Sequence, residues 1–269
     1  TLAIAREIQT RGLINIQFVI HDGELFIIEA NPRASRTVPI ISKATGVNLV
    51  AAATRVALGE KLADLPYGTG LLPDVPFVVV KVPVFSFAKM RGVETILGPE
   101  MKSTGEVLGI DETFAGALRK GFVAAGVRIP DPNVGDGARI LVSISDDEKE
   151  EAMPIVRRYA ELGFSLVATE GSHHALARNG IVSERINKIA DGSPHVLDLI
   201  TSHRVDLVIN AAGPREANDG YRIRRAAVES SVACLTSLDT ARALASALES
   251  FAGPPRSLQD YRRLAASVV

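Results

Sequence analysis

Beyond residue 138 the chain repeats one pattern, a short apolar run followed by a segment of helical character. The apolar runs that read as strands are 139–145, 166–169, 205–210 and 232–236. Helices are predicted at 148–162, 172–178, 194–203, 221–230 and 239–250. Strands and helices in strict turn predict an α/β fold, a doubly wound parallel sheet with helices on both faces. Ligands of such sheets bind past the carboxyl ends of the strands.

Polar residues follow the ends of these runs. Lys149 follows the first run, Lys188 lies beyond the second, and Asn210 ends the third. The second run ends in Thr169-Glu-Gly-Ser172, a glycine turn at a helix start, where backbone N–H groups and hydroxyls can hold a phosphate. Taken singly, a hydroxyl there is usually a helix cap and a lysine is usually solvated. Because the ends of parallel strands meet at one edge, we expect these residues on one rim.

A second informative stretch, from Leu13 to Arg36, reads as a β-hairpin that turns at His21-Asp22-Gly23-Glu24. Side chains alternate along a strand, so Glu29 and Asn31 project to one face, and Gln17 can join them from the partner strand. One carboxylate with amide oxygens suits Mg²⁺ or Mn²⁺ when water and nucleotide phosphates fill the other positions. The alternative to a metal site is an ordinary amphipathic hairpin whose polar face is exposed to solvent.

The strand register tests this metal-site prediction. With a two-residue Asp-Gly turn, Gln17 faces Ile28 rather than Glu29. An odd loop at 22–24, closed by a bulge at the glycine, places Gln17 opposite Glu29, and we expect that loop.

Two arginines, Arg33 and Arg36, follow the expected metal ligands directly. A guanidinium presents a planar fork of donors that matches phosphate oxygens. Their position favours a phosphate-handling site over a plain surface hairpin.

Composition limits the classes of function. The chain has 269 residues with 30 basic and 31 acidic side chains, so its near-neutral charge makes no case for nucleic acid or membrane. Cys234 is the one cysteine, which excludes an intrachain disulfide and zinc clusters of the cysteine type and fits a cytoplasmic location. No run of eighteen apolar residues predicts a membrane span. Residues 2–9 already have helical spacing behind Thr1, so we expect the C-terminal portion of a larger chain.

The stretch Ile129–Gly137 packs two prolines and two glycines into nine residues, which predicts a boundary. Ahead of it, Thr113 is a possible N-cap of a helix within 111–125. The expected organisation is a first domain at 1–112, a helix and linker at 113–137, and a second domain at 138–269.

At the hairpin the chain resembles a known family. The segments IEANPRASRTVP (28–39), SKATG (42–46) and GPEMKSTGE (98–106) resemble the end of an ATP-grasp domain, specifically that of the carbamoyl phosphate synthetase large chain. The RTVP form at 36–39 is similar to the second of the two synthetase halves. The resemblance implies that residues 1–112 are the C-terminal portion of the domain that phosphorylates carbamate.

The resemblance also implies roles for the hairpin residues. ATP and Mg²⁺ or Mn²⁺ would be the cofactors, Glu29 would bridge two metal ions, and Gln17 and Asn31 would each take one. Gln17 and Glu29 would also serve the ATP site, and Arg33 and Arg36 would be catalytic. In the full enzyme, a glutamine amidotransferase small chain would be a partner, and an oligomer is expected.

From Arg139 onward the chain resembles the methylglyoxal-synthase-like domain that ends this large chain and binds nucleotide effectors. The positions that match effector contacts are Lys149, Thr169, Ser172, Lys188 and Asn210. The stretch Asn210-Ala-Ala-Gly-Pro departs from the form with hydroxyl residues after the asparagine. Val82 and Leu235 lie near the positions where some members carry acidic residues for ornithine, so no ornithine response is expected.

Two other functions remain open. A methylglyoxal synthase, which is a lyase, needs a catalytic aspartate that the loop after Asn210 does not offer. An isolated nucleotide-binding regulatory module is the second alternative. His173, His174 and His195 are expected at the surface or as helix caps.

Overall fold

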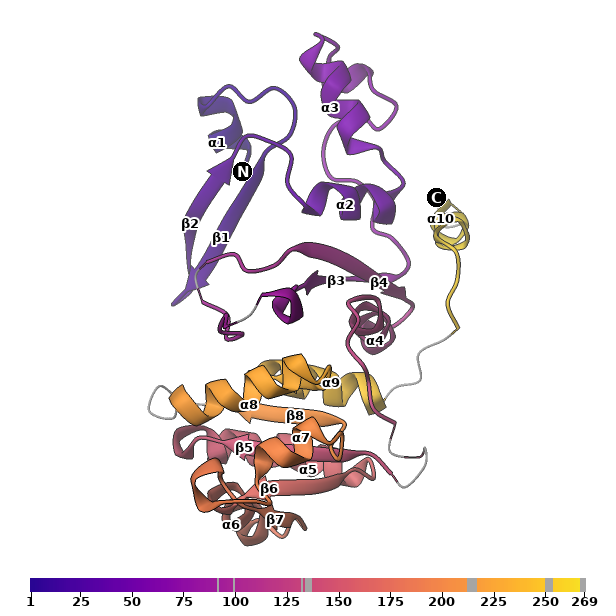
Figure 1. The fold of residues 1–269 in the computed structure, drawn as a ribbon. Coiled ribbons are helices and arrows are strands. Elements are labelled where there is room, and N and C mark those ends of the chain that lie inside the picture. Colours follow the sequence, from indigo (N-terminus) through magenta and orange to yellow (C-terminus); the bar gives the residue numbers. More distant parts are fainter. Residues whose placement is uncertain are drawn as a thin grey trace. The chain divides into compact units, whose positions relative to one another are not determined.

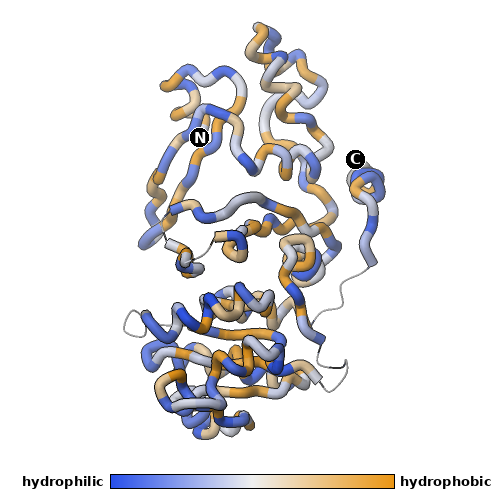
Figure 2. Tube along the Cα trace, viewed as in Figure 1, coloured by the Kyte–Doolittle hydropathy of each residue, from blue (hydrophilic) through white to orange (hydrophobic). Residues whose placement is uncertain are grey.

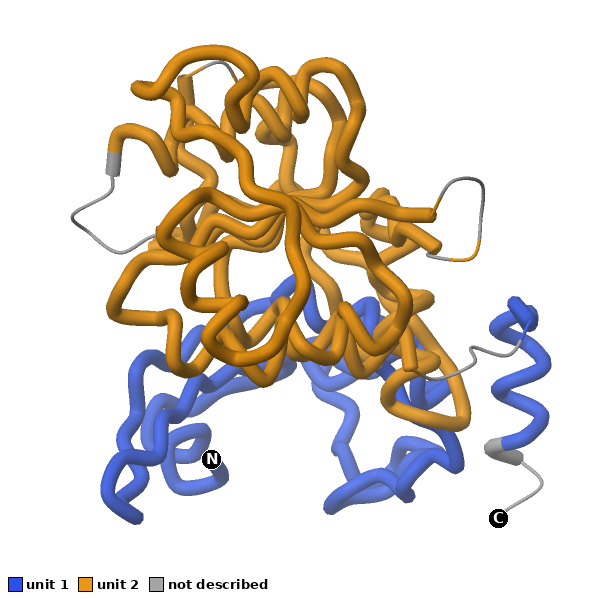
Figure 3. The backbone as a smooth tube through the Cα atoms, turned by 90° about the horizontal axis from the view of Figure 1, so that it is seen from below, with its two compact units in different colours: residues 1–79, 254–269 blue, residues 80–253 orange. Residues whose placement is uncertain are grey.

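A computed structural model describes residues 1–90, 92–98, 100–131, 133, 137–211, 217–249 and 254–266. The chain forms two compact units, Thr1–Val79 with Pro254–Val269, and Val80–Gly253 (Figure 3). The two packing units have other limits than the expected domains at 1–112, 113–137 and 138–269. The second unit begins at Val80, inside the expected first domain. The expected domain limits rest on the family resemblance and stay a prediction.

The second unit contains a five-stranded parallel sheet of order β7-β6-β5-β8-β9 (Figure 1). Its strands are β5 (Arg139–Ile144), β6 (Ser165–Thr169), β7 (Glu184–Ile186), β8 (Leu207–Ala211) and β9 (Ala233–Leu235). The predicted parallel α/β sheet is confirmed. Strand β7 was not predicted, because its sequence Glu-Arg-Ile contains two exposed charged side chains and no apolar run.

Helices cover both faces of this sheet. They are α5 (Lys149–Glu161), α6 (Glu170–Arg178), α7 (Val196–Thr201), α8 (Ala217–Glu229) and α9 (Leu238–Glu249), with short 3-10 turns η3 (Asp146–Glu148) and η4 (Ile189–Asp191). Ile140 and Val142 belong to an apolar cluster with residues of α5, α6 and α9, whereas Leu141 belongs to a cluster with residues of α7 and α8. This alternation along β5 is the reason that residues 140–142 of the central strand are all apolar.

A smaller layer joins the same unit. Strands β3 (Val78–Val84) and β4 (Gly105–Asp111) form a two-stranded sheet, and η2 (Phe87–Lys89) lies in their connection. Helix α4 (Phe114–Ala124) follows, and the predicted N-cap is confirmed, since the Thr113 hydroxyl accepts a hydrogen bond from the Gly116 N–H at 3.1 Å. Residues Val82, Leu118 and Phe122 extend the apolar cluster of α5, α6 and α9.

Helix α4 lies directly on strand β4 through two glycines. A Cβ atom added at Gly109 would lie 1.9 Å from the Ala117 carbonyl oxygen and 2.4 Å from the Gly121 nitrogen. Only a residue without a side chain permits this approach.

The first unit contains short helices around a hairpin. Its elements are α1 (Leu2–Glu7), β1 (Asn15–His21), β2 (Glu24–Asn31), α2 (Thr37–Thr45), α3 (Leu49–Ala57), η1 (Leu62–Asp64) and α10 (Leu258–Ala266). The Asn48 side chain caps α3 by accepting from the Ala51 N–H at 3.0 Å. The rings of Phe77 and Tyr261 meet edge to face with centroids 5.4 Å apart, which ties α10 to this unit.

The hairpin has the expected Gln17–Glu29 pairing, but a bulge within the strand produces it rather than the loop. Gln17 lies opposite Glu29, but the turn is a two-residue one at Asp22 and Gly23, whose φ angles are 51° and 80°. The expected odd loop is therefore wrong. The register shifts just after Gln17, so the extra residue, Ile28, sits in the strand rather than in the loop. Asp-Gly adopts the tight turn that it favours, and the bulge restores the pairing.

Both faces of the hairpin carry exposed apolar side chains. They are Phe18, Val19, Ile20, Leu25, Phe26, Ile27 and Ile28, each at least 37% exposed. Figure 2 shows these apolar residues along both strands. Strands that are apolar on both faces are typical of the interior of a larger sheet. No helix within the described ranges is both long and apolar enough to cross a bilayer.

Candidate functional site

The hairpin brings together the three expected metal ligands. Gln17 and Glu29 are direct partners across the strands, and Asn31 lies two residues beyond Glu29, on the same face. Gln17 and Glu29 are exposed and Asn31 is half-buried. Three oxygen-bearing side chains therefore point to one side of β1 and β2.

This donor set fits a hard divalent cation whose remaining ligands come from elsewhere. Within the described residues there is no group of three or more His, Cys, Asp and Glu that would hold a metal by itself. The hairpin offers one carboxylate and two amides, a set that leaves most of an octahedral shell to phosphate oxygens and water. The metal-ligand roles of Gln17, Glu29 and Asn31 stay a prediction.

The two arginines predicted as catalytic lie at the end of the hairpin. Arg33 donates to the Ala34 carbonyl at 3.1 Å and to the Asn31 side-chain oxygen at 3.4 Å. Arg36 is exposed and directly precedes α2. Both follow the metal-ligand face within a few residues, and their catalytic roles stay a prediction.

In the second unit, all five expected effector-contact residues line one pocket of about 590 Å³ at the carboxyl ends of the strands. They are Lys149, Thr169, Ser172, Lys188 and Asn210. We call this the rim pocket. Its volume lies in the range of pockets that bury small molecules. The structure thus brings together side chains that are separated by as many as 61 positions in the sequence.

Two buried hydroxyls organise the glycine turn. Ser172 Oγ accepts a hydrogen bond from the Ile144 N–H at 3.1 Å, and Thr169 Oγ1 donates to Ser172 Oγ at 3.4 Å. Ser172 is 1% exposed. These bonds tie the end of β5 to the first turn of α6, which lines the pocket with Gly171 and Ser172; the N–H groups of a helix's first turn have no partner within the helix and suit an anion.

Lys149 lies over the same turn. A Cβ atom at Gly171 would come within 2.9 Å of its Nζ, so the glycine makes room for the lysine. Its ammonium pairs with the Asp146 carboxylate, and this contact, with a smaller effect of Lys188, lowers the pKa of Asp146. An anionic ligand that binds Lys149 would therefore have to replace the Asp146 carboxylate as its partner.

Asn210 is 2% exposed and has both ends of its amide engaged. Its Oδ1 accepts from Arg224 Nη1 at 2.9 Å, and its Nδ2 donates to the Ser143 carbonyl at 3.3 Å. Because arginine can only donate, the Arg224 contact assigns the oxygen, and the NH₂ group lies on the other side.

Sequence reasoning missed part of the pocket wall. The further lining residues include His174, Ile189, Val196, Asn218, Asp219, Gly220 and Ile223. Helix α8 was predicted to begin at Tyr221, yet it begins at Ala217, so Asn218 and Asp219 belong to its first turn. The Asn-Asp-Gly sequence reads as a turn, and the packing of Ile223 under the sheet overrides that preference.

His195 is a helix cap and His174 is exposed, as predicted, whereas His173 is half-buried and bonds to Ser183. His195 caps α7 by accepting from the Asp198 N–H at 3.4 Å. His173 Nδ1 is 2.9 Å from Ser183 Oγ, and His174 is exposed at the pocket edge.

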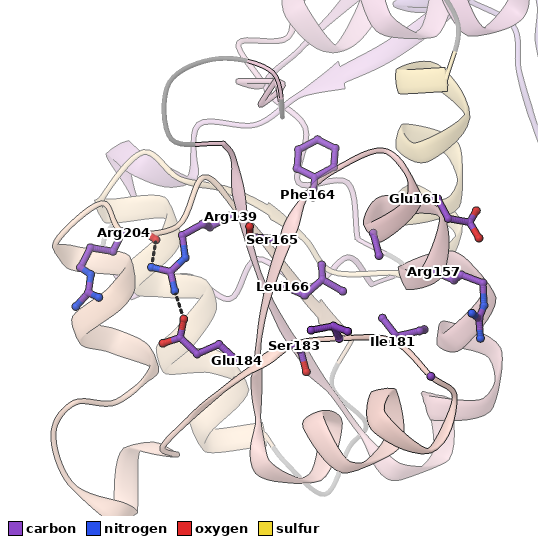
Figure 4. Close-up of a pocket in the computed structure, with 13 residues that line it drawn as sticks. Arg139, Arg157, Glu161, Phe164, Ser165, Leu166, Ile181, Ser183, Glu184 and Arg204 are labelled. Carbon is purple, nitrogen blue, oxygen red and sulfur yellow. Dashed lines mark hydrogen bonds and ion pairs between the residues drawn. The ribbon is translucent and has the colours of Figure 1, made fainter.

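A second hollow, of about 790 Å³, lies at the opposite, amino ends of β5 and β6 (Figure 4). Two of its three arginines, Arg139 and Arg157, are already engaged by protein groups. Arg139 donates to Glu184 at 2.5 Å and to the Arg204 carbonyl at 3.4 Å, and Arg157 donates to the Asn179 carbonyl at 2.6 Å. The rim pocket lies at the edge where α/β sheets bind ligands, so it is the stronger candidate.

Comparison with known families gives two matches. Residues 151–236 match the MGS-like domain, and residues 1–65 match the carbamoyl-phosphate synthase L chain, ATP binding domain. The first match covers α5 to β9 of the rim-pocket unit, and the second covers the hairpin with its oxygen donors. A partial ATP-binding domain of this large chain followed by an MGS-like domain matches the C-terminal region of the carbamoyl-phosphate synthase large chain.

Proposed function

We propose that the chain forms the C-terminal part of a glutamine-dependent carbamoyl phosphate synthetase, in which ATP phosphorylates carbamate. The product would serve arginine and pyrimidine biosynthesis. The match of residues 1–65 to the ATP-binding domain supports the reaction class, and the Gln17–Glu29 pairing supports the site. A glutamine amidotransferase small chain as partner, an oligomeric enzyme and a cytoplasmic location belong to this proposal.

The hairpin residues would act by charge and position. A carbamate oxygen attacks the γ-phosphorus of ATP, a new O–P bond forms, and ADP leaves with the electrons of the broken bond. Glu29, Gln17 and Asn31 would hold divalent ions, which supply charge neutralisation at the phosphates when bound. Arg33 and Arg36 follow directly and would stabilise charge on the transferring phosphoryl group.

The rim pocket would hold a nucleotide effector. Lys149 and Lys188 supply positive charge, and the turn at Thr169–Ser172 supplies N–H groups at a helix start, so this part suits the phosphate. Ile189, Val196 and Ile223 line the same pocket and offer an apolar surface for a base. The convergence of all five expected contact residues in one pocket carries this proposal.

Binding and turnover separate the candidate functions. Calorimetric titration of uridine and inosine monophosphates into the chain should give saturable binding, and the full enzyme should make ATP from carbamoyl phosphate and ADP. Nucleotide binding without any such turnover in the full enzyme would favour a regulatory module alone. Formation of methylglyoxal from dihydroxyacetone phosphate would favour the lyase, for which Ala211–Pro214 offers no aspartate; residues 212–216 lie outside the described residues.

A further inference from the structure

Arg224 connects the rim pocket with the β3–β4 connection. Its side chain is 1% exposed, and Nη1 donates to Asn210 Oδ1 at 2.9 Å. The other two guanidinium nitrogens face Glu94: Nε lies 2.9 Å from Oε1 and Nη2 lies 2.7 Å from Oε2. Arg224 thus makes a bidentate ion pair on one side and orients a pocket amide on the other.

Glu94 is held as firmly as its partner. Its Oε1 also accepts from the Thr95 N–H at 2.7 Å and the Ile96 N–H at 3.1 Å. Hydrogen bonding from Arg224 is the main reason that the pKa of Glu94 is lowered to about 2. The carboxylate is therefore ionised and geometrically fixed at neutral pH.

The next residue of α8 anchors the same connection. Arg225 donates to the carbonyls of Phe87 and Met90, both at 3.3 Å, and Lys102 donates to the Ile96 carbonyl at 2.7 Å. Two consecutive arginines of one helix thereby hold residues on both sides of position 91, which lies outside the described residues. The same helix contributes Asp219 and Ile223 to the pocket wall.

A purely structural ion pair would need only the Glu94 side of this arrangement. The third contact, to Asn210, fixes which end of the amide faces a ligand, because the oxygen is committed to Arg224. Without Glu94 the buried guanidinium loses its counter-charge and must find other partners. The orientation of Asn210 would then rest on its hydrogen bond to the Ser143 carbonyl alone.

We propose that Glu94 and Arg224 are positioning residues for the rim pocket: they hold the Asn210 amide so that the second N–H of its NH₂ group, the one not donated to Ser143, is available to an anionic ligand, and they link pocket occupancy to the hydrogen bonds that Glu94 accepts from Thr95 and Ile96. This inference rests on the proposed binding of a phosphate-bearing nucleotide. Linkage between two binding events is reciprocal. If the Glu94–Arg224 contact raises the affinity of the pocket for a ligand by some factor, the bound ligand stabilises that contact by the same factor.

Calorimetry on the full chain with uridine monophosphate tests the positioning role. Glu94→Gln should weaken binding about fivefold to tenfold, the effect of one misplaced hydrogen bond to a charged group. In an Asn210→Ala background the same substitution should change the dissociation constant less than about twofold, because its effect acts through Asn210. Glu229→Gln is the matched control, since it removes the carboxylate that pairs with Arg225 at 2.8 Å and leaves Arg224 untouched.

Amide hydrogen exchange tests the linkage in the unaltered chain. Saturating nucleotide should slow exchange at Thr95 and Ile96, whose N–H groups bond to Glu94. If Glu94→Gln does not fold, the charge-free pair Glu94→Leu with Arg224→Met should fold and bind as weakly as Asn210→Ala.

Three outcomes would overturn the inference: equal affinity of Glu94→Gln and the unaltered chain, an equal loss from Glu94→Gln with and without Asn210, or unchanged exchange at Thr95 and Ile96. Failure of the unaltered chain to bind either nucleotide or inorganic phosphate would instead remove the proposed pocket function, and the inference with it. That failure is seen before any substitution is made, so the two are distinguishable.

Discussion

Lys149→Ala is the substitution that tests the rim pocket most directly. Lys149 is the first residue of α5, its side chain is 18% exposed, and its Nζ lies over Gly171 at the start of α6. A charge-assisted hydrogen bond from such a group to a phosphate contributes about 1.5 to 3 kcal/mol. In the unliganded chain, however, the Lys149 ammonium already forms an ion pair with Asp146. A ligand phosphate must replace that contact, which places the expected loss at the lower end of the range.

The expected result is therefore about a tenfold rise in the dissociation constant of uridine or inosine monophosphate, measured by calorimetry. Added salt should weaken binding to the unaltered chain more than binding to Lys149→Ala, since one screened cation is gone. Arg242→Gln is the charge-matched control, because Arg242 lies on α9, pairs with Glu151 and Asp239, and is absent from the pocket wall. Equal affinities of Lys149→Ala and the unaltered chain would refute the reasoning and leave Lys149 as a structural partner of Asp146.

Three further predictions concern the hairpin, the α4 contact and acid stability. In the full enzyme, Glu29→Gln should slow ATP formation from carbamoyl phosphate and ADP by about a hundredfold, because the only carboxylate of the expected metal set loses its charge; an undiminished rate would exclude Glu29 as a metal ligand. Gly109→Ala should lower the free energy of unfolding by about 3 kcal/mol or more, since its Cβ would lie 1.9 Å from a backbone oxygen, whereas Gly105→Ala, with its nearest neighbour at 3.8 Å, should be almost neutral in urea unfolding. Glu94 has a folded pKa of about 2, below its ordinary 4.5, so its ion pair stabilises the chain fully above that ordinary value and the contribution is lost as pH falls towards 2. Because the Glu94 side chain is 37% exposed, we expect about 1 kcal/mol of this loss between pH 5 and pH 3, and Glu94→Gln should lack it; the same pH dependence in both proteins would contradict the assignment.

Periodicity alone determined the class of fold. Residues such as Ile140 to Val142 are apolar without interruption because β5 is buried on both faces, and such runs between helical segments permit few architectures other than a parallel sheet. The positions of Lys149, Thr169 and Asn210 near strand ends then followed from chain order, because the carboxyl ends of parallel strands share one edge. The alternation of side chains along strands likewise placed Glu29 and Asn31 on one face, whereas the Gln17–Glu29 pairing was predicted from an odd loop that the hairpin does not have.

Tertiary packing decided what local signals leave open. Asp22-Gly23 favours a two-residue turn, and only the pairing of the whole hairpin moved the extra residue to Ile28. Strand β7 has no apolar run of its own and exists because the edge of β6 supplies its hydrogen-bond partners. Arg224 and Glu94 are 130 positions apart, and neither lies in a motif. Their contact depends on how α8 packs, which no pattern of nearby residues encodes, because an ion pair with a buried arginine is selected by the three-dimensional surroundings of both charges.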